Sequence, residues 1–160
     1  MQPFVHLHVH SQYSVLDGQA SVKALVDKAI ANGMRGIALT DHGNMFGIKE
    51  LTDYVNKKNK DVDGEIKNLK KTIEELKSAD AVDQEALSKA ETALKEAESK
   101  IFTPIIGCEM YVADNDMTDR SNKKDIGRHL IVLAKNQHGY HNFIKLVKKA
   151  GGEVIIYIRQ

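Results

Sequence analysis

Apolar and polar positions divide the 160 residues into three stretches of different character. The first stretch, 1–55, and the third, from residue 101 onward, place short apolar runs between amphipathic segments, which is typical of strands alternating with helices. Strands connected through helices run parallel by default, so we expect an α/β fold of parallel strands flanked by helices. The pattern predicts strands at 4–9, 36–39, 104–112, 129–134 and 154–158, and helices at 21–32, from about 45 to 54, and at 138–149.

The helix expected at 21–32 has sequence signals at both ends. Ser21 is a typical N-cap, because its hydroxyl can accept a hydrogen bond from a free amide of the first turn. Gly33 suits the position just past the last turn, where the chain often adopts a left-handed conformation.

The middle stretch, 56–100, contains no aromatic residue and no proline, but it has 10 lysines and 11 acidic residues. Its apolar residues recur at helical spacing, which predicts two helices separated by the polar segment 78–83. Such helices can fold back on each other as an antiparallel coiled-coil hairpin. We expect this hairpin to be inserted within a domain that spans 1–149, with its charges forming a solvated surface; a binding role for these charges is the alternative.

The composition excludes several classes of protein. With 23 basic and 22 acidic residues the formal net charge is +1, which excludes a polycationic nucleic-acid coat. The single cysteine cannot form an internal disulfide, so a disulfide-stapled secreted scaffold is excluded and a reducing, cytoplasmic location is favoured. Apolar runs are too short to span a bilayer and the start of the chain does not resemble a signal peptide, so we expect no membrane partner.

Three of the seven histidines lie in one short segment. His6, His8 and His10 alternate with apolar residues, so a strand would point the three imidazoles toward one face. Equivalent side chains lie about 6.6 Å apart along a strand, close enough for neighbouring imidazoles to converge on one metal ion or a close pair of ions. The alternative is that these histidines merely alternate on a surface, but three in succession before a polar turn favour a metal site.

Further side chains of metal-ligand type occur where the expected strands begin or end: Asp17, Asp41, His42, Glu109 and His129. In parallel α/β folds the loops at the carboxyl ends of strands converge on one crevice. Imidazoles and carboxylates together suit zinc, manganese or iron. Each residue also has a structural alternative: a turn for Asp17, a helix cap for Asp41, a lysine pair for Glu109 and a buried position for His129.

The sequence contains no competing catalytic motif. It lacks a G-x-S-x-G nucleophile elbow, a G-x-x-x-x-G-K-[ST] phosphate loop and a G-x-G-x-x-G dinucleotide fingerprint. Cys108 alternates to the face opposite Glu109, so we expect a buried apolar side chain and not a nucleophile. His138 and His141 fall on a basic helix, where we expect exposed side chains.

Four ordered blocks of the sequence carry recognisable motifs. They are 4–18, FVHLHVHSQYSVLDG; 38–47, ALTDHGNMFG; 104–112, PIIGCEMYV; and 129–134, HLIVLA, followed by Gly139-Tyr140. This order resembles the PHP (polymerase and histidinol phosphatase) domain family, in the form found at the N-terminus of bacterial replicative DNA polymerase III alpha subunits. The resemblance covers residues 3–149, apart from 56–100.

The resemblance implies a distorted β/α barrel with a cluster of divalent metal ions, zinc or manganese, at the carboxyl ends of its strands. The complete domain would hold two or three ions. Carried over position by position, the family's metal ligands fall on His8, His10, Asp17, His42, Glu109 and His129. Of these, His8, His10 and His42 would act in catalysis through the bound metal. His6 would neighbour the cluster and Asp41 would orient an imidazole from a second layer. The implied activity is phosphodiester hydrolysis, as in 3′–5′ proofreading, with the ions activating a water molecule.

The resemblance extends over only part of the family's domain. The family's later strands, with a further cysteine ligand and an Asp-x-His pair, have no counterpart here, and residues 150–160 do not resemble its continuation. We therefore expect a partial PHP barrel from a nucleotidyltransferase, with DNA and replisome subunits as partners of the parent polymerase. A partial barrel exposes sheet edges, which favours pairing between copies of the chain. The alternatives are a stand-alone PHP-type metal-dependent phosphatase and a non-catalytic replisome interaction module.

Overall fold

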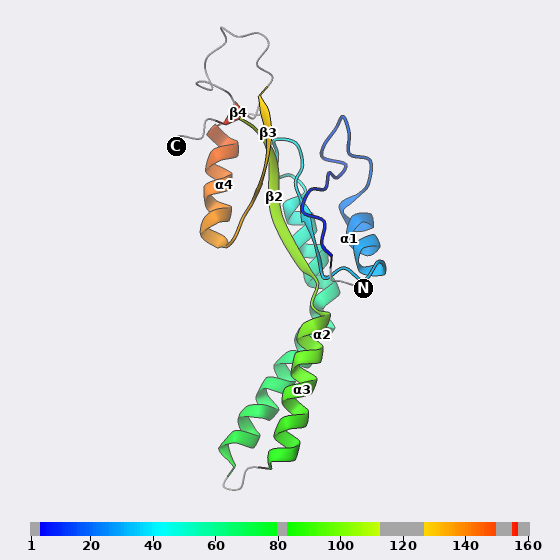
Figure 1. Ribbon diagram of the computed structural model, residues 1–160, viewed down its shortest axis with the longest axis vertical. Helices are drawn as coiled ribbons and strands as arrows, with labels where there is room; N and C mark the ends of the chain where they lie inside the picture. Colours follow the sequence, from blue (N-terminus) through cyan, green and yellow to red (C-terminus); the bar gives the residue numbers. More distant parts are fainter. Residues whose placement is uncertain (1–3, 80–82, 113–126, 150–154, 157–160) are drawn as a thin grey trace.

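The computed structural model describes residues 4–79, 83–112, 127–149 and 155–156. Figure 1 shows a body of mixed helices and strands from which two long helices extend as an arm. In chain order the elements are α1 (Val22–Ala31), β1 (Gly36–Leu39), α2 (Ile48–Ser78), α3 (Gln84–Lys100), β2 (Thr103–Val112), β3 (Arg128–Leu133), α4 (Gln137–Lys149) and β4 (Ile155–Ile156). The mixed α/β class expected from the sequence is confirmed.

Strand β2 is the centre of the sheet. Its first half pairs in parallel with β1, so that Gly36 faces Thr103 and Leu39 faces Ile106. Its second half pairs with β3 and, at its end, in parallel with the two residues of β4. Of the strand expected at 154–158 and of the tail at 150–160, only β4 lies within the described residues.

The expectation that all strands run parallel is wrong for β3. Strands β2 and β3 are antiparallel, with Gly107 opposite Leu133 and Val112 opposite Arg128. A parallel neighbour requires a crossover connection, usually a helix. The sequence between Val112 and Arg128 is polar and carries no amphipathic repeat, so the sequence gives no signal for such a crossover helix.

The N-terminal segment, expected as a strand at 4–9, is extended but is not a regular strand. It runs beside β1, where the amide of Ala38 donates to the carbonyl of His6 and the amide of Thr40 donates to the carbonyl of Val9, each at 2.9 Å. The amide of Val9 donates to the side-chain hydroxyl of Thr40 and not to a backbone carbonyl. The Thr40 side chain therefore interrupts the backbone ladder that would define a strand.

Helix α1 confirms the local signals at its ends. Ser21 has extended backbone angles and its hydroxyl accepts from the amide of Ala24, while Gly33 follows the helix with a φ of 73°. The buried face of α1 packs with β1 and the start of α2 into the main core. The buried members of this core are Val22, Val26, Ala29, Ile37, Leu39, Ile48, Leu51, Val55 and Phe102.

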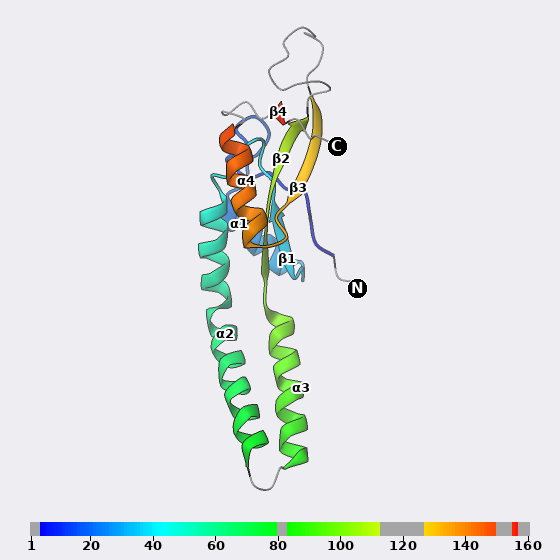
Figure 2. The same cartoon turned by 90° about the vertical axis from the view of Figure 1, so that its left-hand side faces the viewer.

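Helix α2 passes without interruption from the body into the arm, so no structural break marks the expected boundary at residue 56. Figure 2 shows α2 and α3 lying side by side along the arm and running in opposite directions. Ion pairs join the two helices, with Lys77 3.0 Å from Glu91 and Lys70 3.5 Å from Glu98. Apolar residues of both helices, including Ile73 and Ala97, are buried between them. None of the described helices is both long and apolar enough to cross a membrane.

Candidate metal centre

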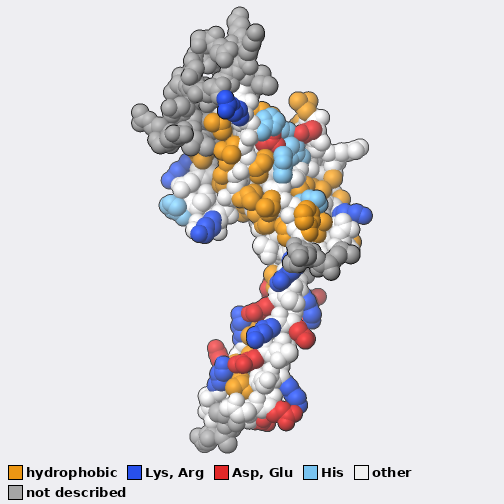
Figure 3. Space-filling model, in the orientation of Figure 1, with side chains coloured by type: hydrophobic (Ala, Val, Ile, Leu, Met, Phe, Trp, Pro, Cys, Tyr) orange, Lys and Arg blue, Asp and Glu red, His pale blue; other side chains and the backbone are white. Residues whose placement is uncertain are grey.

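Histidine and acidic side chains gather at one place on the body, beside exposed hydrophobic side chains (Figure 3). Five parts of the chain bring them there: the N-terminal segment, the turn that follows it, the loop after β1, strand β2 and strand β3. The ladder between β1 and β2 continues into the loop, because the amide of Glu109 donates to the carbonyl of Asp41 at 3.1 Å. The amide of Gly43 donates in turn to the carbonyl of Glu109 at 2.9 Å. This backbone pairing fixes His42 next to Glu109.

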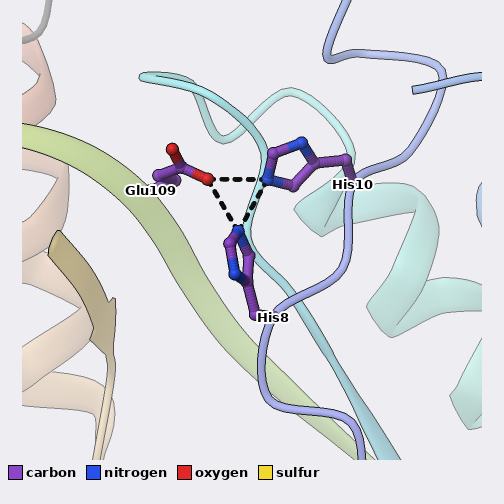
Figure 4. A group of neighbouring side chains, drawn as sticks. All are labelled: His8, His10 and Glu109. Carbon is purple, nitrogen blue, oxygen red and sulfur yellow. Dashed lines mark hydrogen bonds and ion pairs between the residues drawn. The ribbon is translucent and has the colours of Figure 1, made fainter. Parts of the chain in front are cut away.

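The first group of metal-ligand type consists of His8, His10 and Glu109. Figure 4 shows both imidazoles pointing from the N-terminal segment toward the carboxylate on β2. One carboxylate oxygen, Oε2, lies 2.7 Å from Nε2 of His8 and 2.8 Å from Nε2 of His10. The two Nε2 atoms are themselves 2.9 Å apart. Three ligand atoms thus face a common point.

The second group consists of His10, Asp17 and His42. Oδ2 of Asp17 lies 2.9 Å from Nδ1 of His10 and 2.6 Å from Nε2 of His42. His10 belongs to both groups, and each of its ring nitrogens faces a carboxylate. A neutral imidazole carries only one N–H, so it cannot donate to Asp17 and Glu109 at the same time. A metal ion bound at one ring nitrogen would remove this conflict and leave the other N–H to donate.

Glu109 connects the two groups and His129. Its side chain is 1 % exposed, and its second oxygen, Oε1, lies 2.5 Å from Nδ1 of His129 and 3.3 Å from Nδ1 of His42. Among the described residues this buried oxygen has no well-aligned hydrogen bond. A buried carboxylate oxygen without a donor is costly, whereas a carboxylate surrounded by imidazoles is a usual ligand arrangement for a divalent ion. The residues present therefore fit a metal centre.

Both carboxylates of the centre are held in the ionised form. Desolvation is the largest single influence and raises the pKa of Glu109, but the hydrogen bonds with His8 and His10 and the charges of His42 and His129 together leave that pKa below its usual value. Burial also acts to raise the pKa of Asp17, and hydrogen bonds with His42 and His10 again give a net lowering. Metal ions bind the ionised form of a carboxylate, so the lowered pKa values of Glu109 and Asp17 favour metal binding.

Tyr111 borders the centre and was not identified from the sequence. Its ring stacks with that of His42 at a centroid distance of 5.9 Å, and its hydroxyl lies 3.3 Å from Nδ1 of His42. Desolvation and the charges of Glu109 and Asp17 raise the pKa of this hydroxyl. It therefore stays protonated and can donate. Its position two residues after Glu109 on a strand, which places both side chains on one face, was the available signal.

A buried layer behind the centre holds the loops in place. The Asp41 carboxylate is 2 % exposed and accepts from the amide of Ser11 at 2.6 Å, from the Ser11 hydroxyl at 2.8 Å and from the Ser14 hydroxyl at 3.0 Å. Ser14 Oγ also accepts from the amide of His42 at 3.0 Å. Asp41 thus ties the segment after His10 to the loop that carries His42. Neither serine was identified from the sequence, because serines in a turn are common and their partners are far away along the chain.

Two expected second-layer roles differ from the structure. The Asp41 carboxylate contacts Ser11 and Ser14 where an imidazole was expected. His6, expected beside the cluster, is exposed and packs edge-on against Phe4 with a ring centroid distance of 4.8 Å. His8 and His10, further along the same segment, contact Glu109.

Cys108 is fully buried beside Met110 and Phe143, as expected, and desolvation raises the pKa of its thiol to about 12. The exposed positions expected for His138 and His141 are also confirmed.

We predict that iodoacetamide at pH 8 alkylates Cys108 at least about 100-fold more slowly in the folded chain than in guanidinium, because only the thiolate reacts. The rates are measured by mass spectrometry. Equal rates in the two solvents would contradict the buried, protonated thiol.

Comparison with known proteins agrees with this geometry. The PHP domain family matches residues 6–159, a range that includes most of the tail expected to depart from it. The DNA polymerase III subunit alpha of Treponema pallidum is 40 % identical over 157 residues, which are 96 % of this chain and 10 % of that protein. The subunits of Borreliella burgdorferi and Chlamydia trachomatis are 36 % and 31 % identical, over 89 % and 97 % of this chain and 9 % of each relative. The chain spans about a tenth of the length of these curated relatives. The resemblance stated from the sequence motifs is confirmed, and the chain belongs to the PHP domain family.

Proposed function

We propose that this chain is the PHP portion of a bacterial DNA polymerase III alpha subunit and that its metal centre hydrolyses phosphodiester bonds, as in 3′–5′ proofreading. One observation carries the proposal: four imidazoles, those of His8, His10, His42 and His129, face the buried Glu109, and Asp17 contacts two of them, although these residues lie up to 121 positions apart in the chain. Surface histidines and acidic residues with no shared task do not converge in this way.

The proposed ligands are the six that the motifs indicated: His8, His10, Asp17, His42, Glu109 and His129. Zinc or manganese fits this mixture of imidazoles and carboxylates. Bound divalent ions would lower the pKa of a water molecule and neutralise charge on phosphate oxygens. The neutral form of His10 can bind one ion through one nitrogen while donating its other N–H to a carboxylate, which fixes the ring orientation.

The chain's own residues would contribute position and hydrogen bonds. Glu109 supplies negative charge between the imidazoles, and Asp17 orients His10 and His42. The Tyr111 hydroxyl, kept protonated by its raised pKa, can donate to a phosphate oxygen that enters beside His42. Asp41, through Ser11 and Ser14, preserves the spacing between the two segments that carry His10 and His42.

The fold supports a more specific architectural proposal. Strands β1 and β2 with the N-terminal segment would form part of a PHP-type β/α barrel, and the arm made by α2 and α3 would be an insertion between two of its strands. The arm has many exposed charges and only a narrow apolar seam. The polymerase activity and the replisome contacts would belong to the parent protein.

The test measures metal content and hydrolysis together. After loading with zinc or manganese and desalting, we expect two or more ions per chain by elemental mass spectrometry, and hydrolysis of bis-p-nitrophenyl phosphate. His10→Ala removes the imidazole shared by both groups, so we expect a loss of at least one ion and a fall in hydrolysis of about 100-fold or more.

His138→Ala is the matched control, because it removes an exposed histidine of α4 and should change neither readout. A chain that binds no metal and hydrolyses nothing would contradict the proposed function and leave a non-catalytic interaction module. Activity that persists in His10→Ala would contradict the assignment of the ligands.

A further inference from the structure

A groove of mixed aromatic and basic character leads away from the metal centre. A cavity of about 530 Å³ beside the centre is lined by His42 and Tyr111 and by exposed apolar residues of the turn after His10. A second cavity, of about 550 Å³, lies over the start of α2. Tyr13 and Phe46 line both cavities, so the two are joined across these rings.

The two shared aromatic residues differ in burial: Tyr13 is partly buried and packs against the main core, whereas Phe46 is exposed. Phe46 is 76 % exposed, so its ring is accessible for stacking with a bound base. Tyr13 is held by a 3.2 Å hydrogen bond from its hydroxyl to Glu50, which fixes its ring at the junction. Tyr54 adds a third ring in the second cavity, with its hydroxyl anchored to Asp27 at 2.8 Å.

The second cavity also carries positive charge. Lys23, Lys49 and Lys57 line it. Lys49 is paired with Asp53, and Glu50 accepts a hydrogen bond from Tyr13 but keeps its negative charge. The three lysines and two acidic residues of the lining leave a net charge of +1. Lys23 and Lys57 form no ion pair with the described residues. Lys23 lies in the first turn of α1, which contains no acidic residue, so its charge adds to the positive end of the helix dipole.

Aromatic faces combined with lysines of this kind are the features that bind single-stranded nucleic acid. Bases stack on the rings regardless of sequence, and the lysines neutralise the phosphates. We propose that this groove binds a single-stranded polynucleotide, with a terminal nucleotide in the cavity beside His42 and the preceding phosphates along Lys23 and Lys57. The placement of the terminal nucleotide beside His42 rests on the proposed function, whereas the binding of the polynucleotide in the groove does not.

The experiment measures binding without metal, so that no hydrolysis is needed. Fluorescence anisotropy of a fluorescein-labelled (dT)12 is recorded with the full chain in EDTA at several salt concentrations. The double variant Lys23→Gln/Lys57→Gln should weaken binding about tenfold and reduce the slope of log K against log salt by about 1.4, since each single-strand phosphate contact contributes about 0.7. Phe46→Ala should also weaken binding about tenfold, through lost stacking.

The matched control is Lys67→Gln/Lys95→Gln, which removes the same charge from the arm and should bind as the unaltered chain does. Circular dichroism checks that all variants fold. Equal binding of (rU)12 agrees with the proposal. The lysines contact phosphates and the aromatic rings contact bases, and neither contact depends on the 2′-hydroxyl.

Three outcomes would overturn the groove: no binding of (dT)12, an equal loss in the arm control, or displacement by polyglutamate as effective as displacement by (dT)12. The proposed function fails separately. A chain that binds (dT)12 through Lys23, Lys57 and Phe46 but cleaves no phosphodiester retains the groove and loses the catalytic role. A chain that cleaves the small diester while the groove variants bind (dT)12 normally retains the catalytic role and loses the groove.

Discussion

Replacing Glu109 with glutamine is expected to weaken divalent metal binding by more than about 100-fold and to abolish phosphodiester hydrolysis. Glu109 has the largest expected effect because its two oxygens face four imidazoles, those of His8 and His10 on one side and those of His42 and His129 on the other. Glutamine keeps the shape but removes the charge and replaces one oxygen with a hydrogen-bond donor. Isothermal titration with zinc and with manganese measures the affinity.

Two further variants make this result specific. Asp17→Asn removes a carboxylate that faces His10 and His42 of the second group, so we expect a loss at one of the two groups and partial metal retention. Glu75→Gln alters an exposed glutamate of α2 and should leave metal binding unchanged. Metal affinity in Glu109→Gln equal to that of the Glu75 control would show that the buried carboxylate is not a ligand.

Replacing Asp41 with alanine is expected to lower the free energy of unfolding by about 3–5 kcal/mol. The buried carboxylate accepts three hydrogen bonds from Ser11 and Ser14, and its removal leaves those donors without their partner in a dry environment. The same change loosens the segments that carry His10 and His42, so metal affinity should fall as well. Urea denaturation followed by circular dichroism measures the stability.

Asp53→Ala is the control for this second experiment. Asp53 is exposed and its ion pair with Lys49 lies on the surface, so its loss should change stability by no more than about 0.5 kcal/mol. If Asp41→Ala cost less than about 1 kcal/mol, the layer behind the metal centre would not be the support that its hydrogen bonds indicate.

Residues of the candidate centre could be recognised from the sequence because their chemical types and their spacing within short segments are visible there. The alternation of His8 and His10, and the polar loop with His42 directly after an apolar strand, point to ligands without knowledge of the fold. Their grouping could not be recognised. Only the pairing of β1 with β2 brings Glu109 beside His42, and that pairing joins residues far apart in the chain.

The strand directions show the same limit. Alternation of strands and helices favours parallel pairing, and this rule holds for β1 and β2 but not for β2 and β3. The N-terminal segment has a strand-like alternation, yet the hydroxyl of Thr40, which precedes Asp41, takes the place of a backbone partner. Thr40 lies 31 residues after Val9, so the pattern of apolar and polar residues within the N-terminal segment does not indicate this hydrogen bond.

The sequence by itself determined what depends on neighbours along the chain: the ends of α1, the two helices of the arm, the short buried strand before Asp41, and the ligand-type residues with their family motifs. Helical periodicity, capping and motif spacing act over a few residues, so they can be seen in one dimension. The tertiary structure alone decided the antiparallel direction of β3, the place of Glu109 among four imidazoles, the support from Ser11 and Ser14, and the groove across Tyr13 and Phe46. Each of these joins distant segments, and the free energy that fixes them comes from burial and hydrogen bonds formed only when those segments meet.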